Sequence, residues 1–270
     1  MLGNHLWTPS HATMKTMNNN PIDSLLLLGV TLVALLLAAY GGKFIFKRRL
    51  ERAEVEDDEA KLVLGAILSL LMLLIGLVLS IAVGGYTDRV AAQENEALAI
   101  GSAFQRTELL PLPLRQQATD LLEQYLEARI HFFDIGSGPE HQQWRVRAEQ
   151  LQSELWDLAV VQAQTSPNSV DASVLKAYES LYRTLQKTQF DWRHHIPVVG
   201  WWALLAAAFL ANALIGYNIR GIKGENWLIV ILPLLTTGAF FLIAEIDLPG
   251  AGIIRVLPDG LIAVHTLFTH

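Results

Sequence analysis

The chain has 270 residues, of which 52% are hydrophobic and 17% are charged, and its mean hydropathy is +0.33. This composition is too apolar for an ordinary soluble domain and is typical of a membrane protein with several spans. The net charge of −6 leaves no basic surface for a phosphate backbone, which excludes nucleic acid as a partner. Because the chain has no cysteine, disulfides, haem attachment and thiolate metal sites are excluded as well.

The N-terminal part of the chain has a polar segment followed by an apolar one. Residues 1–20 are polar and aperiodic, which predicts a disordered N-terminus. Residues 22–46 are apolar, and basic residues from Lys43 to Arg52 lie at their C-terminal end. A signal peptide carries its positive charge before its apolar region, so we predict an uncleaved first membrane span rather than a signal peptide.

A second apolar stretch, residues 62–86, contains no charged residue. A helix of roughly 20 such residues crosses the hydrocarbon core, so this stretch is predicted to span the membrane. Charges return at Asp88 and Arg89, yet no helix breaker follows before Gly101 and no proline before Pro111. The sequence therefore predicts one long helix that leaves the bilayer. Residues 21–86 form a first transmembrane helix pair with a short charged loop.

The loop between these two spans predicts their orientation. Residues 47–61 place a basic half beside the first span and an acidic half beside the second. Basic residues near span ends favour the cytoplasm and acidic residues count little, so the loop is predicted to be cytoplasmic. Residues 87–195 are then outside.

Residues 87–195 are predicted to form a helical bundle outside the bilayer. Breakers at 110–113, 136–139 and 166–168 divide the region into four helices. The later helices each combine a polar face with one apolar stripe, formed by Leu114, Ala118, Leu121, Leu122 and Tyr125, by Trp144, Ala148, Leu151 and Leu155, and by Leu175, Tyr178, Leu181 and Leu185. This pattern is typical of an antiparallel bundle.

Residues 196–246 are predicted to form a second transmembrane helix pair, with spans at 196–217 and 227–246. Arg220 and Lys223 place the turn between them in the cytoplasm. Residues 247–270 form a C-terminal tail, with a short extended piece at 252–256 and a last helical turn or two from Asp259. The predicted fold is an all-α integral membrane protein with four transmembrane helices and an antiparallel helical bundle inserted between spans two and three.

One face of the second span carries a stripe of small side chains. At about 100° per residue, its members fall within about 100° of one another. We call these residues the small-residue stripe: Gly65, Ser69, Gly76, Ser80 and Gly84. Small residues let helices approach closely in lipid, so the favoured interpretation is a packing seam whose natural partners are Ala207 and Ala211. The alternative is a narrow pore lined by this helix in an oligomer.

The other spans contain few polar residues. Asn212 lies roughly 16 Å into the bilayer, where a helix-to-helix hydrogen bond is favoured over a permeation or substrate site. Pro233 interrupts the fourth span and leaves backbone carbonyls without a hydrogen-bond donor. These carbonyls could line a cavity; the alternative is a kinked helix without a functional role. Glu245 and Asp247 are expected at the outer interface, where a solvated helix end is favoured over a mouth that attracts cations.

Arg129 falls in the middle of an apolar stripe, where an unpaired guanidinium is costly. Folding the chain back on itself at residues 110–113 sets Glu94 across from Arg129. We therefore predict a buried or half-buried ion pair between Glu94 and Arg129 that fixes the register of this hairpin. The alternative is that Arg129 snorkels to the bundle surface by its long stem.

No cofactor or metal site is predicted. The four candidate ligands are His131, His141, His194 and His195, but the sequence has no HxxxH or HExxH spacing. It has no GxSxG, Walker loop or GxGxxG motif either, so an enzyme is the weakest functional class.

The run from Glu94, ENEALAIGSAFQRTELLPLPLRQQATDLLEQYLEARI, resembles the bacterial bestrophin-like membrane family of unknown function, as do the paired spans before it, the RR-containing loop and the terminal IDLPGAGIIRV. The resemblance covers residues 23–261. Its sharpest parts are Glu94 with Ala97 and Ile100, Leu109-Leu110-Pro111, and Tyr125 with Arg129. It implies a four-span, all-helical protein with a helical domain between the second and third spans.

The name of that family points to bestrophins, which are pentameric anion channels whose second span lines the pore. The resemblance thus implies a homo-oligomeric, ion-channel-like protein among membrane lipids, with inorganic ions as candidate ligands. Its expected location is the bacterial inner membrane. The charge rule puts its helical domain on the extracytoplasmic side, whereas bestrophins keep theirs in the cytosol. The alternative function is a non-conducting envelope protein whose helical domain senses or binds a ligand.

Overall fold

The computed structural model describes residues 21–50, 57–165, 168–218, 228–248, 250 and 254–268. Regular structure within these ranges is helical, which confirms the all-helical prediction. The helices are α1 (Pro21–Leu50), α2 (Asp57–Thr107), α3 (Leu114–Ile135), α4 (Pro139–Thr165), α5 (Ser169–Arg193), α6 (Val198–Asn218), α7 (Leu228–Asp247) and α8 (Asp259–Phe268). The predicted disordered segment 1–20 lies outside the described residues.

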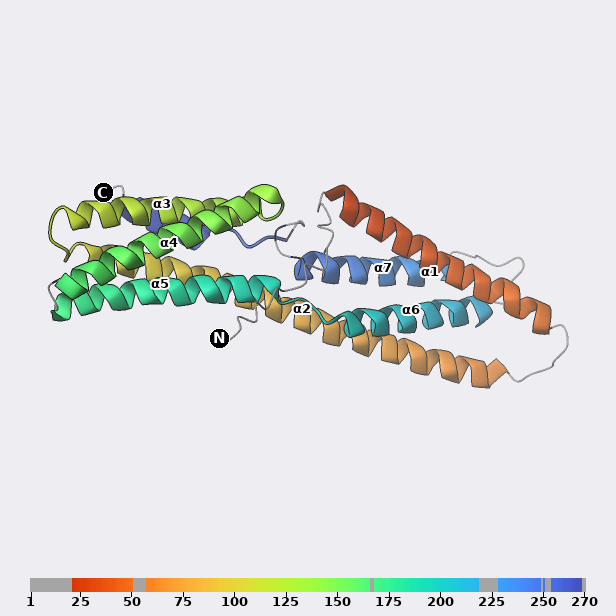
Figure 1. Ribbon diagram of the computed structural model, residues 1–270. Coiled ribbons are helices and arrows are strands. Elements are labelled where there is room, and N and C mark those ends of the chain that lie inside the picture. The colour runs from red at the N-terminus through yellow and green to blue at the C-terminus, as the bar shows by residue number, and fades with distance from the viewer. Residues whose placement is uncertain are drawn as a thin grey trace, which may run out of the picture.

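The helices pack in two clusters at opposite ends of an elongated molecule (Figure 1). We call one the apolar cluster; it consists of α1, the first half of α2, α6 and α7, and its core is Leu35, Leu71, Val78, Ala82, Ile196, Leu204, Ala207, Ala208, Ala211, Phe240 and Ile243. We call the other the bundle cluster; it consists of the second half of α2 with α3, α4, α5 and α8.

Helix α2 belongs to both clusters because it runs without interruption for 51 residues. This confirms the prediction of one long helix that continues past the apolar stretch. At 1.5 Å rise per residue the helix is about 77 Å long, far more than the hydrocarbon core requires. A single rigid element therefore connects the two clusters.

The predicted breakers end the bundle helices where the sequence places them. α3 ends before Gly136, whose φ of 71° suits a residue without a side chain. α5 begins after Asn168, whose side-chain oxygen accepts hydrogen bonds from the backbone N–H groups of Val170 at 2.8 Å and Asp171 at 2.9 Å. These hydrogen bonds satisfy donors that the first turn of a helix otherwise leaves free.

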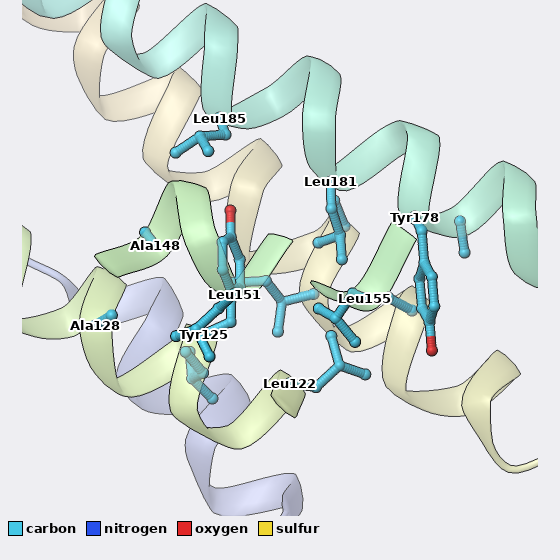
Figure 2. Close-up of a cluster of buried hydrophobic side chains, with 14 of the residues drawn as sticks. Leu122, Tyr125, Ala128, Ala148, Leu151, Leu155, Tyr178, Leu181 and Leu185 are labelled. Atoms are coloured by element: carbon cyan, nitrogen blue, oxygen red, sulfur yellow. The ribbon is translucent and has the colours of Figure 1, made fainter. Parts of the chain in front are cut away.

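The apolar stripes of the bundle helices face one another and form its core (Figure 2). The side chains that Figure 2 labels come from three helices: Leu122, Tyr125 and Ala128 of α3, Ala148, Leu151 and Leu155 of α4, and Tyr178, Leu181 and Leu185 of α5. All are buried. The helical spacing of apolar residues thus identified the core positions of this cluster.

The C-terminal segment joins the bundle cluster. Leu261 of α8 and Val256 before it are buried in the bundle core. The helix expected from Asp259 is confirmed, while the extended piece expected at 252–256 lies partly outside the described residues. Gly250, with φ of 81°, meets Gly136 so closely that a Cβ on either residue would overlap the backbone of the other.

Three segments are long and apolar enough, by length and composition, to cross a membrane. They are 61–107 in α2, 169–217, whose apolar part is α6, and 229–247 in α7. The apolar stretch of α1 that the structure describes, Leu28–Phe44, is shorter.

Two glycines allow α1 and α6 to pack closely, and neither was singled out in the sequence. A Cβ on Gly216 would overlap the carbonyl oxygen of Ala39, and a Cβ on Gly42 would overlap that of Ala213. The backbones therefore touch along this seam, as small residues permit between apolar helices. We call this contact the α1/α6 seam.

Replacing Gly216 with alanine should force α1 and α6 apart. The backbone atoms that the new methyl group meets cannot move independently, so we expect a loss of roughly 1–3 kcal/mol in unfolding free energy. The matched control is Gly76→Ala, because a Cβ there meets no atom within 4 Å. Unfolding of the detergent-solubilised variants measures both, and equal stabilities would contradict the close contact.

Candidate functional site

Arg89 lies on α2 where the helix passes from the apolar cluster to the bundle cluster. Its guanidinium donates hydrogen bonds to four main-chain carbonyl oxygens, those of Asp191 at 3.4 Å, Ile246 at 3.0 Å, His194 at 3.3 Å and Asp247 at 3.1 Å. These carbonyls belong to the C-terminal ends of α5 and α7 and to the residue after α5. Arg89 therefore joins three helices at one point, which we call the junction.

Burial of a cation at the junction has a clear electrostatic compensation. Only 2% of Arg89 is exposed. Burial lowers the pKa of its guanidinium, and the carboxylates of Asp247 and Asp191 oppose that shift. Helix C-termini carry free carbonyls and partial negative charge, so both helix ends stabilise the cation. In the sequence, Arg89 marks only the return of charge after the second span, and no motif identifies its contacts.

Acidic and histidine side chains surround Arg89 and line a cavity of about 250 Å³. Asp247 accepts a hydrogen bond from the backbone N–H of Ile196 at 2.9 Å, and Asp191 forms an ion pair with Lys187 at 2.9 Å. His195 Nδ1 lies 3.0 Å from the carbonyl oxygen of Asp247. The junction thus has both hydrogen-bond acceptors and donors. The side chains that line it do not include a nucleophile paired with a general base.

A second buried polar group lies in the bundle cluster. Arg129 and Glu96 are fully buried and form a bidentate ion pair, through Nε to Oε1 and through Nη2 to Oε2, the latter at 3.0 Å. Tyr125 and Thr188 donate hydrogen bonds to the same carboxylate at 3.2 Å and 2.9 Å. Burial and the carboxylate raise the pKa of Tyr125 well above its ordinary value.

The prediction that Arg129 pairs with Glu94 is corrected by the structure. Glu94 is exposed, and the carboxylate beside Arg129 is that of Glu96. Two residues along a helix correspond to a turn of about 200°, so Glu94 and Glu96 point to nearly opposite faces. Glu96 shares its face with Ala92, Ala99 and Ile100, all buried. That apolar spacing was the signal in the sequence that could have identified the partner.

The small-residue stripe also differs from its favoured interpretation. Its five residues are exposed, and a Cβ on Gly65, Gly76 or Gly84 would meet no atom of the described part of the chain within 4 Å. Ala207 and Ala211 are buried in the apolar cluster instead. Among the described residues of one chain, the predicted contact between this stripe and the third span is therefore not made. The close contact between apolar helices is instead the α1/α6 seam.

The remaining polar candidates are buried. The amide nitrogen of Asn212 donates a hydrogen bond to the carbonyl oxygen of Ala208, in its own helix, at 2.8 Å. This differs from the predicted hydrogen bond between two helices. Glu245 and Asp247 are 6% and 7% exposed. The favoured solvated helix end is thus wrong, because both side chains line cavities between helices.

The candidate histidines are dispersed. His131 stacks on Trp144 at 4.5 Å between ring centroids, and His141 packs against Phe132 at 4.0 Å. Burial, with the nearby arginines, lowers the pKa of His141 to about 4, so the ring is neutral at physiological pH. Within the described residues, no group of three or more candidate ligands could hold a metal ion.

This architecture, with apolar helices of membrane-spanning length joined by one long helix to a polar helical bundle, is that of a helical membrane protein. The sequence profile of the Bestrophin-like domain matches residues 29–261. The chain therefore belongs to the Bestrophin-like domain family. No functionally curated protein matches it.

Solved structures share the fold. One variant of a bacterial Bestrophin homolog from Klebsiella pneumoniae superposes with a TM-score of 0.65 at 12% identity, over 91% of this chain and 95% of that one. A structure of the Klebsiella pneumoniae homolog phased on zinc gives 0.63 at 11% identity, over 88% and 94%. At such low identity the similarity establishes the fold alone.

Breaking the ion pair between Glu96 and Arg129 on one side only should destabilise the protein strongly. Removing one partner leaves a buried charge alone, so we expect Glu96→Ala and Arg129→Ala each to cost on the order of 3–5 kcal/mol in unfolding free energy. The double variant should lose much less than the sum. Glu94→Ala is the matched control and should be near neutral, because Glu94 is exposed. Chemical unfolding in detergent measures all four, and additive losses would contradict the pairing.

Proposed function

We propose that the protein is a homo-oligomeric, ion-channel-like membrane protein in which α2 faces the common axis. The observation that carries the proposal is the small-residue stripe, which is exposed on α2 and whose three glycines have open space beside them among the described residues. Small residues allow close approach of neighbouring copies and leave room along an axis. Membership of the Bestrophin-like domain family supports the proposal.

The proposed arrangement has four membrane spans. Residues 21–86 and 196–246 form the two transmembrane helix pairs, and residues 87–195 form the inserted bundle, onto which α8 of the tail 247–270 packs. α1 has 30 residues, about 45 Å at 1.5 Å rise, so its apolar stretch is flanked by enough helix to cross the core.

The chemistry of the stripe is neutral. It offers the hydroxyl groups of Ser69 and Ser80 and the backbone at its glycines, without a charged side chain. Ser69 Oγ donates to the Gly65 carbonyl at 2.9 Å, which leaves the hydroxyl oxygen available as an acceptor. A stripe of this kind fits the passage of inorganic ions and assigns no sign to them.

A binding function for the bundle is the second candidate, and one observation favours it. A cavity of about 320 Å³ between α4 and α5 is lined by Trp156, Tyr178 and Tyr182 with two glutamates. Gln152 Nε2, which is buried at this cavity, has no hydrogen-bond partner among the described residues. This arrangement supports a non-conducting envelope protein that binds a ligand through its helical domain.

Ion flux into liposomes tests the channel proposal. The purified protein should carry ions above the rate of empty vesicles, and Gly76→Phe should reduce that flux because its ring enters the proposed axis. Leu37→Phe is the control, since Leu37 is 66% exposed on α1, away from the stripe. An absence of flux across pH and voltage would reject the channel and favour the binding candidate.

Cysteine labelling tests the orientation, which the charge rule places with the bundle outside. The native chain has no cysteine, so single cysteines report without background. In whole cells, an impermeant thiol reagent should label Glu140→Cys, exposed in the first turn of α4, and should not label Glu56→Cys in the segment 47–61 that the charge rule assigns to the cytoplasm. Both should react after lysis. The reverse pattern would put the bundle in the cytosol.

A further inference from the structure

The cavity of about 320 Å³ between α4 and α5 has a composition that points to one class of ligand. The two helices pack side by side in the bundle cluster (Figure 1). The volume is at the lower end of the range for small-molecule sites. The lining residues that matter for its chemistry are Glu149, Gln152, Trp156, Tyr178, Glu179 and Tyr182. We call it the α4/α5 cavity.

Helix register brings the aromatic walls of the α4/α5 cavity together. Gln189 of α5 donates a hydrogen bond to Glu149 of α4 at 2.8 Å, which fixes one level of this antiparallel pair. Two helical turns from that contact, about seven residues later in α4 and seven earlier in α5, lie Trp156 and Tyr182. Tyr178, one turn farther along α5, lies on the same face as Tyr182.

The faces of these three rings are uncovered. Trp156 and Tyr182 are 38% and 54% exposed, while Tyr178 is buried, and its hydroxyl group is held by a 2.7 Å hydrogen bond with that of Thr107. Among the described residues, the three rings do not stack on one another or on other rings, and no lysine or arginine lies over them. The face of an indole or phenol ring attracts a cation, and several such faces together select a quaternary ammonium group.

The charged residues that line the α4/α5 cavity are acidic. Glu149 is already engaged, because Oε1 accepts from Gln189 and lies 3.9 Å from Arg145. Glu179 is exposed and forms no ion pair or hydrogen bond among the described residues, so its carboxylate adds to the attraction that the rings exert on a cation. Lys176 and Arg183, one turn away on α5, pair with neither glutamate within that part of the chain.

Gln152 supplies a hydrogen-bond donor at the α4/α5 cavity. The residue is only 7% exposed, and its Nε2 has no partner among the described residues. A buried donor without a partner costs free energy, which a ligand with an oxygen acceptor would recover. Gln152 lies one turn, about 6 Å, from Trp156 along α4, so the acceptor and the ammonium group are joined by a short spacer. The nearby glutamates disfavour an anionic acceptor.

We propose that the α4/α5 cavity binds a quaternary ammonium compound with a neutral oxygen acceptor, which is the chemistry of choline. The ammonium group lies between Trp156 and Tyr182, close to Glu179, and the oxygen accepts from Gln152 Nε2. The inference rests on the binding function proposed above for the bundle, and it does not depend on ion conduction.

Choline could come from solution or as part of a phosphocholine lipid headgroup. Tyr182 lies nine residues before Asp191 on α5, which puts it about 14 Å along the helix axis from the junction. This distance from the apolar cluster, together with the cost of a phosphate beside two glutamates, favours free choline.

Equilibrium dialysis of the full chain against radiolabelled choline, in dodecyl maltoside, tests the site. We expect saturable binding that tetramethylammonium displaces and that 3,3-dimethylbutanol, the neutral isostere of choline, does not. Trp156→Leu and Tyr182→Leu should each weaken choline binding roughly 3- to 30-fold, the range that a cation–π contact provides. Gln152→Leu should weaken the binding of choline and leave that of tetramethylammonium unchanged, because the latter has no acceptor.

Matched variants keep the test decisive. Tyr182→Phe retains the ring and should bind choline as wild type does, and Glu154→Gln removes an exposed carboxylate of α4 outside the cavity and should have no effect. Equal choline binding by wild type, Trp156→Leu and Tyr182→Leu would overturn the proposal. Displacement by 3,3-dimethylbutanol as effective as that by tetramethylammonium would overturn it too.

A soluble headgroup separates the two sources. Glycerophosphocholine should displace choline more weakly than unlabelled choline does, which would support free choline as the ligand, whereas stronger displacement would overturn that assignment in favour of a lipid headgroup. Dialysis involves no membrane barrier, so its result is independent of ion flux. Absence of choline binding would reject this site, whereas ion flux into liposomes decides between the two candidate functions, so the two failures are distinguishable.

Discussion

Arg89 holds the structure together at the point where its two parts meet. The guanidinium donates to carbonyl oxygens at the ends of α5 and α7, while its backbone belongs to α2. Without that cation, four main-chain carbonyl oxygens at the ends of α5 and α7 would lose a donor at once. The relative position of the apolar cluster and the bundle cluster therefore depends on one side chain and on the rigidity of the helix that carries it.

The polar groups inside the bundle follow the same rule. Glu96 receives hydrogen bonds from Arg129, Tyr125 and Thr188, so a fully buried carboxylate is surrounded by donors from α3 and α5. The Arg129 guanidinium also lies 4.1 Å from the centre of the Phe132 ring. Such a network contributes little net stability compared with an apolar core, but it tolerates only one register of the helices. Through these contacts, Glu96 of α2 is linked to both α3 and α5.

Glycine serves two different purposes in the apolar cluster. At the α1/α6 seam, Gly42 and Gly216 let two backbones touch inside the chain. On α2 the small-residue stripe is exposed, and a Cβ on any of its glycines would meet no atom of the described residues within 4 Å. The same residue type thus marks an internal contact in one place and an open face in the other. The open face remains available to another copy, to lipid or to an axis.

The sequence alone determined the helices and their limits, because apolar periodicity, uncharged length and the prolines and glycines at breaks act locally along the chain. It also determined that Arg129 needs a carboxylate, since burial of a lone charge is prohibitive wherever the helix lies. Only the tertiary structure decided that the carboxylate is Glu96, that Arg89 meets the ends of α5 and α7, and that Glu245 is enclosed. These contacts join residues far apart in the chain, and the rotation of each helix about its axis, which selects them, is set by packing of all the helices together.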